Sequence, residues 1–74
     1  MNLPSISDGY DAYQRAILAM IKQEERRLSI KLPQVHAEAM SRGLANVLYT
    51  RGLELDEDFL RITIYKTFVD WRFV

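Results

Sequence analysis

The side chains best suited to chemistry in this 74-residue sequence are a single histidine, His36, and the four carboxylates of residues 54–58. A covalent catalyst needs a nucleophile beside a base, and a phosphate-binding enzyme needs a glycine-rich loop. The chain has no cysteine, and its three glycines are isolated. His36 lacks a suitable carboxylate, because Glu38, two positions on, would lie on a different face of a helix. The sequence therefore predicts no catalytic residues and a protein that is not an enzyme.

The carboxylates of residues 54–58 also raise the question of a divalent cation. They lack the spacing and the glycine of a calcium-binding loop, and one histidine without cysteine offers no zinc set. Asp56 instead has the features of a helix N-cap, with Glu57 and Asp58 in the first turn, where carboxylates are favoured by the helix dipole. We therefore expect no metal ion and no cofactor.

Three stretches of helical periodicity predict an all-α fold, a compact three-helix domain. Apolar side chains recur at spacings of three and four over residues 9–29, behind Asp8 as the expected N-cap. A second helix is expected over 33–51, because proline at position 33 fits a first helical turn and Gly52 fits a left-handed C-terminal residue. A third is expected over 57–73.

The connections between these helices are short, which favours antiparallel neighbours in a single domain of residues 1–74. Residues 1–7 have little periodicity and predict an extended N-terminal arm, whose Leu3 and Ile6 dock on the helices. Gly43 lies within the second helix, where it costs about 1 kcal/mol relative to alanine. We expect a close helix crossing along Ala39, Gly43 and Val47; the alternative is a break in the helix.

The C-terminal segment allows two secondary structures. Residues 60–65 are β-branched or aromatic and partly alternating, which is typical of a strand. An α+β fold with a C-terminal strand at 60–74 is therefore the alternative. Thr63, Lys66, Thr67 and Asp70 form one polar stripe at helical spacing, and no turn residue interrupts the segment. These observations favour the helix.

As a helix, the C-terminal segment is too apolar for one partner to cover. Its apolar residues span roughly 200° of the circumference, whereas a simple surface helix has an apolar stripe of about 100°. A chain of this size without disulfides or metals is often stabilised by oligomerisation. We therefore expect a homodimer formed through this helix, with Tyr65, Phe68, Trp71 and Arg72 as the contacts to a second subunit or another protein, because aromatic residues and arginine dominate binding hot spots.

The net charge of zero hides two charged segments. Residues 22–31 carry +2 and contain Lys22, Arg26 and Arg27, whereas residues 54–58 carry −4. Matching of charges to helix dipoles explains both segments. The functional alternative makes them docking surfaces, with Lys22, Arg26 and Arg27 at one and Asp56, Glu57 and Asp58 at the other.

The basic end of the first helix also supports a second hypothesis, a small DNA-binding transcriptional regulator. Ala39 and Gly43 have the offset found in helix-turn-helix motifs, but Glu38, Tyr49 and Gly52 occupy positions that such a motif fills differently. Zero net charge argues against a large contribution from phosphate contacts. Nucleic acid is therefore a partner that the sequence does not favour.

The remaining class is a small interaction protein. The N-terminal residues show no export signal and the longest apolar run has six residues, which predicts a cytoplasmic protein with no membrane segment. Small helical chains without catalytic residues are common among bacterial and phage regulators. We therefore expect a bacterial or phage modulator that binds and inhibits or regulates another protein.

Overall fold

The computed structural model describes residues 2–74, which form three α-helices and no strand. The helices are α1 (Tyr10–Leu28), α2 (Gln34–Thr50) and α3 (Glu57–Asp70), and a short 3-10 turn, η1 (Ile6–Asp8), precedes them. The predicted all-α, three-helix fold is confirmed. The C-terminal segment is a helix and not a strand, but α3 ends at Asp70 and not at the predicted residue 73, because Arg72 takes a left-handed conformation.

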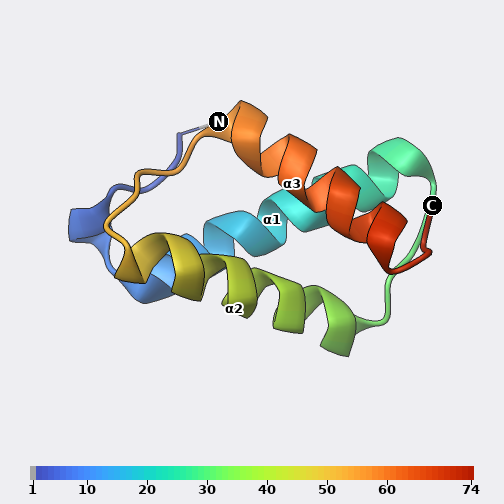
Figure 1. The fold of residues 1–74 in the computed structure, drawn as a ribbon, viewed down its shortest axis with the longest axis horizontal. Helices are drawn as coiled ribbons and strands as arrows, with labels where there is room; N and C mark the ends of the chain where they lie inside the picture. Colours follow the sequence, from blue (N-terminus) through green and yellow to red (C-terminus); the bar gives the residue numbers. More distant parts are fainter. Residues whose placement is uncertain (1) are drawn as a thin grey trace.

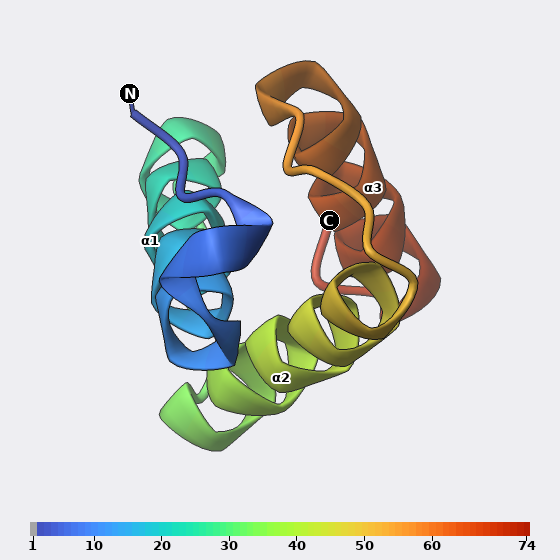
Figure 2. The same ribbon diagram turned by 90° about the vertical axis from the view of Figure 1, so that its left-hand side faces the viewer.

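Helix α1 packs against both of the other helices and against η1. Figure 1 shows α1 passing behind and between α2 and α3, and the end-on view in Figure 2 places the three helices at the corners of a triangle. The outer side of α3 therefore faces away from the rest of the chain.

The core lies inside this triangle and is built from helical columns of apolar side chains. Each helix contributes residues spaced by three or four positions, because such residues share one face of a helix. The linker between α1 and α2 adds Leu32. The buried apolar residues are Tyr13, Ile17, Met20, Ile21, Leu32, Ala37, Met40, Ala45, Leu48, Leu60, Ile64 and Phe68.

All three helices end with one residue in the left-handed conformation. Gly52, with φ of 66°, ends α2 as the sequence predicts, and the N–H of Leu53 donates to the carbonyl of Leu48 at 3.0 Å. Ser29 and Arg72 take the same position after α1 and α3, with φ of 55° and 63°. Because a side chain strains this conformation, each of these two ends costs about 1–2 kcal/mol more than glycine would.

The start of α1 differs from the prediction. The N-cap is Gly9, with φ of 93°, and not Asp8. The carboxylate of Asp8 turns back and accepts a hydrogen bond from the N–H of Ser5 at 2.8 Å, which stabilises η1. Leu3 and Ile6, in the segment predicted as an arm, are partly buried against the core.

Gly43 has neither of the roles that the sequence suggested. Helix α2 runs through it without a break, so it does not separate two helices. It is exposed, and a Cβ built there meets no neighbouring atom within 4 Å, so no helix crosses at this point. The physical reason is its position, since 100° per residue places Gly43 on the side of α2 opposite the buried residues Ser41 and Ala45.

Candidate interaction surface

Helix α3 has a second apolar face, on the side away from the core. Leu60, Ile64 and Phe68 are completely buried against the other helices. Four further apolar residues point outward, and we call them the outer face of α3. They are Phe59, Ile62, Tyr65 and Val69, with exposed fractions of 51, 56, 40 and 44%.

Scattered exposed apolar residues are ordinary on protein surfaces, but a contiguous set is not. The four residues of the outer face follow one another at spacings of three and four along α3, so they form one continuous patch. The helix thus turns apolar side chains to both the core and the solvent. Packing within the chain therefore leaves part of the apolar surface of α3 exposed.

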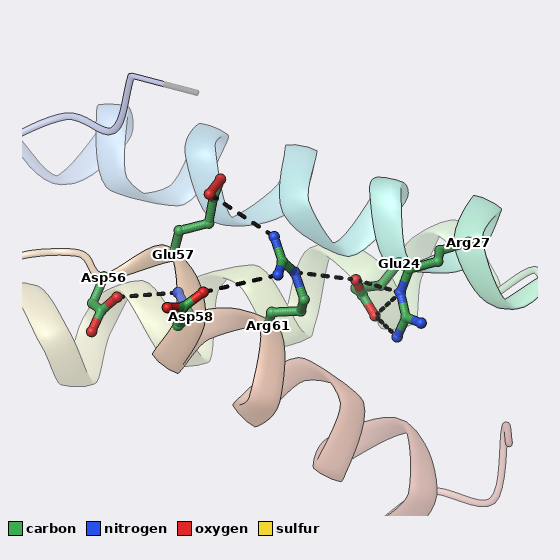
Figure 3. Close-up of polar contacts among 6 residues, drawn as sticks. All are labelled: Glu24, Arg27, Asp56, Glu57, Asp58 and Arg61. Carbon is green, nitrogen blue, oxygen red and sulfur yellow. Dashed lines mark hydrogen bonds and ion pairs between the residues drawn. The ribbon is translucent and has the colours of Figure 1, made fainter.

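Carboxylates at the beginning of α3 cap the helix and pair with one arginine. The Asp56 side chain accepts a hydrogen bond from the N–H of Asp58 at 3.1 Å, which confirms the predicted N-cap. The guanidinium of Arg61 lies 3.9 Å from Glu57 and from Asp58. Figure 3 shows Arg61 between these carboxylates and Glu24 of α1. The acidic run is therefore accounted for in part by local structure.

Glu24 is the buried member of the ionic network in Figure 3, with 4% of its surface exposed. Both of its oxygens accept hydrogen bonds from Arg27, the shortest 2.6 Å, and Arg61 lies 3.9 Å away. The hydrogen bonds to Glu24 raise the pKa of Arg27 above its usual value. Arg27 and Arg61 thereby satisfy a carboxylate that burial would otherwise destabilise.

The other predicted basic residues fall into two groups. The ammonium of Lys22 donates to Gln34 at 2.8 Å and lies 3.5 Å from Glu25, so it links α1 to the start of α2. Arg26 is exposed, and within the described chain no carboxylate pairs with it. The structure thus gives Lys22 and Arg27 internal partners and leaves Arg26 in solvent. In Figure 3 the Arg27 end of α1 and the Asp56 end of α3 lie at opposite ends of the network.

The predicted C-terminal contacts do not share one environment. Phe68 is completely buried in the core, so in this fold it supports α3 from inside and has no surface to offer a partner. Tyr65 and Trp71 are exposed by two fifths or more, and Arg72 is also exposed. Only Tyr65 lies on the outer face of α3, while Trp71 and Arg72 follow the last turn of the helix.

Trp71 belongs to an aromatic cluster that the sequence did not reveal. Its ring centroid lies 6.2 Å from that of His36 and 6.4 Å from that of Phe73, and His36 and Phe73 are 5.9 Å apart, all edge to face. The three rings line an open hollow of about 360 Å³. No sequence signal could have found this cluster, because His36 lies in the first turn of α2 and its two partners follow α3.

A scan against protein-family models and searches of curated proteins and of solved structures find no match to this chain. Among residues 2–74, no group of three or more histidine or carboxylate side chains is placed to hold a metal ion. None of the described helices is both long enough and apolar enough to span a membrane.

Proposed function

We propose that this chain is a non-enzymatic interaction protein, a modulator that acts by binding protein, and that the outer face of α3 is its surface of association. The observation that carries the proposal is the exposure of Phe59, Ile62, Tyr65 and Val69 in one continuous patch. Apolar surface of this kind gains free energy when a partner removes it from water, at about 25 cal/mol per Å².

The buried half of α3 gives the outer face a second property that binding requires. Leu60, Ile64 and Phe68 anchor the helix from inside, so the outer residues are held in fixed positions before any partner arrives. A surface that is ordered in advance loses less conformational entropy on association. Tyr65, with only two side-chain torsions, loses little in the same way.

The alternative function, DNA binding by the basic end of α1, has less support. Glu24 pairs with Arg27, and Glu25 lies 3.5 Å from the Lys22 ammonium. These carboxylates reduce the positive potential that phosphate contacts need. Arg26 is the residue by which this alternative is tested, because it is exposed and its replacement disturbs no ion pair described here.

Two matched valine substitutions test the proposed surface. Val69 on the outer face of α3 and Val47 on α2 are 44% and 45% exposed, so glutamate at either site has a similar cost in the isolated fold. We expect Val69→Glu to abolish association with protein, whether a second copy or another chain, and Val47→Glu to preserve it. Sedimentation of the pure chain and affinity capture from its native cell, quantified for both variants, measure the two kinds of association.

Equal association by the two valine variants would overturn the proposed surface. Circular dichroism and thermal melting of each variant show that helix content is retained. Tight, salt-sensitive binding to duplex DNA that Arg26→Glu abolishes and Val69→Glu leaves intact would favour the regulator of transcription instead.

A further inference from the structure

We propose that the outer face of α3 is covered by the same face of a second copy, with the two α3 helices antiparallel about a two-fold axis near Tyr65. This inference rests on the proposed function, since it requires that the outer face is a surface of association. It names the occupant of that surface and the orientation in which it binds.

The spacing of residues along the outer side of α3 is that of a helix-pairing seam. Asp58, Ile62, Tyr65 and Val69 lie in α3 at spacings of four, three and four positions, and Arg72 follows three positions later, two residues beyond the end of the helix, with φ of 63°. Alternating spacings of three and four keep one line of side chains facing a partner helix. The three central members are apolar or aromatic and exposed, and the two end members are charged with opposite sign.

The opposite charges of Asp58 and Arg72 favour a second copy in antiparallel orientation. When two such helices cross antiparallel at Tyr65, Asp58 of each copy faces Arg72 of the other, and Ile62 meets Val69. A parallel pair would instead place Asp58 against Asp58 and Arg72 against Arg72, and like charges that face each other repel. Antiparallel helices also bring opposite ends of their dipoles together.

Both end residues are available for such contacts. The Asp58 side chain is 86% exposed, and its 3.9 Å approach to Arg61 is too long for a hydrogen bond. Arg72 is exposed at the end of α3, where its N–H donates to the carbonyl of Val69 at 3.0 Å. That hydrogen bond fixes the backbone of Arg72 and leaves its guanidinium free to reach a partner.

The surface is small, which sets the expected strength of the dimer. Helix α3 has 14 residues and is about 21 Å long. Aromatic side chains such as Phe59 and Tyr65 can bury about 150–250 Å² each, and roughly half of that remains exposed here. Two copies of the face then bury on the order of 1,000 Å² in total, at the lower end of specific interfaces. We expect a dimer that dissociates in the micromolar range.

This pairing leaves other surfaces uncovered. The aromatic hollow of His36, Trp71 and Phe73 and the exposed side of α2 do not belong to the seam. The dimer would have two copies of each surface, which suits a modulator that binds another macromolecule at two sites.

Reciprocal charge exchange tests the antiparallel pairing. In Asp58→Arg the seam places arginine against Arg72 at both ends, and in Arg72→Asp it places aspartate against Asp58 at both ends. We expect each variant alone to dissociate about tenfold or more readily than the native chain. An equimolar mixture of the two variants should recover dimerisation, because the mixed dimer has one opposite-charge pair at each end.

Two substitutions with the same changes of charge serve as controls. Asp11→Arg alters an exposed acid in the first turn of α1, as Asp58→Arg does in α3. Arg51→Asp alters the C-cap residue of α2, which, like Arg72, is an arginine just after the end of a helix. Neither belongs to the seam, so both should dimerise like the native chain. Sedimentation velocity over about 1–200 μM measures dissociation, and circular dichroism checks that every variant is folded.

The outcomes separate the two proposals. A native chain that stays monomeric over this range overturns the pairing, and the proposed function survives if Val69→Glu still removes binding to another protein. A native dimer that both single variants disrupt, with no recovery in their mixture, also overturns the antiparallel pairing. If Val69→Glu and Val47→Glu associate equally, the proposed function is overturned together with the inference that rests on it.

Discussion

Helices α1 and α3 have similar buried sides and different exposed sides. Each buries a column of apolar side chains, Tyr13 and Ile17 in α1 and Leu60 and Ile64 in α3, all without exposed surface. The opposite side of α1 is formed mainly by polar and small residues, namely Asp11, Arg15, Ala19, Gln23 and Arg26. The opposite side of α3 is the apolar outer face.

The difference shows for which helix packing within the chain covers all of the apolar surface. The single apolar stripe of α1 is covered by α2 and α3, so burial within this chain accounts for it. The inner stripe of α3 is covered in the same way, but burial within the chain does not account for its outer face. Stability of the fold thus explains one apolar face on each helix, and we propose that association explains the second apolar face of α3.

The largest expected effect contrasts the two faces of α3 directly. Ile64→Ala removes a completely buried side chain and should lower the free energy of unfolding by about 2–5 kcal/mol. Ile62→Ala removes a side chain that is more than half exposed and should change the free energy of unfolding of the monomer by about 1 kcal/mol or less. Urea unfolding of dilute protein measures both. Equal losses would show that the outer face is part of the monomer core.

Substitutions at the C-terminal ends of the two helices should have a smaller effect on the free energy of unfolding, about 1–2 kcal/mol. Ser29 after α1 and Arg72 after α3 both have positive φ, which glycine adopts without steric strain. We expect Ser29→Gly and Arg72→Gly each to raise the stability of dilute monomer by about this amount. Thermal melting measures the gain. Gly52→Ala is the opposite control and should be destabilising; a gain there would contradict the interpretation.

Tyr13 gives α1 a buried polar contact that the inner face of α3 lacks. Its hydroxyl donates to the carbonyl of Leu53 at 2.9 Å, so Tyr13→Phe should cost about 1 kcal/mol at neutral pH. The matched control is Tyr65→Phe, at a hydroxyl on the exposed outer face. Urea unfolding at pH 7 separates the two substitutions.

Burial, followed by the charge of Glu54, raises the pKa of Tyr13 above 10.0. The folded state therefore holds this proton to higher pH than the unfolded state does. The stabilisation is fully present below pH 10 and is lost as the pH rises through the raised pKa. Unfolding measured from pH 8 to 11 should show this fall in the native chain and a shallower one in Tyr13→Phe; identical profiles would contradict the assignment.

The smallest expected effect concerns the ion pairs of Glu24, one with Arg27 within α1 and one with Arg61 of α3. Arg27→Ala leaves Glu24 buried with only the long contact to Arg61, whereas Arg26→Ala removes an exposed side chain with no ion pair described here. We expect the melting temperature to fall more for Arg27→Ala than for Arg26→Ala. Equal melting temperatures would mean that water satisfies Glu24 as well as Arg27 does.

Local signals in the sequence predicted the elements well where side chains act within one turn. Asp56 caps α3 and Gly52 ends α2 because hydrogen bonds and backbone strain at these positions depend on a few neighbouring residues. Asp8 shows the limit of such signals. It has the side chain of a cap, but its carboxylate is taken by Ser5 and the helix begins after Gly9.

The sequence predicted less about the surface. It indicated that the C-terminal helix is apolar around much of its circumference, yet it did not separate buried Phe68 from exposed Tyr65. Nor did it show that Gly43 faces open space. These distinctions depend on which side of each helix meets its neighbours, and residues far apart in the sequence determine that.

The sequence by itself predicted a helical chain with helices ending near residues 29, 51 and 73, and a last helix with more apolar surface than a simple surface helix, because periodicity and capping are local properties. The helices end at residues 28, 50 and 70. Only the tertiary structure decided which apolar side chains form the core, how Glu24 of α1 meets Arg61 of α3, and where His36 meets Trp71. These contacts join residues from different helices or choose between faces of one helix. Their free energy arises only when α1, α2 and α3 come together.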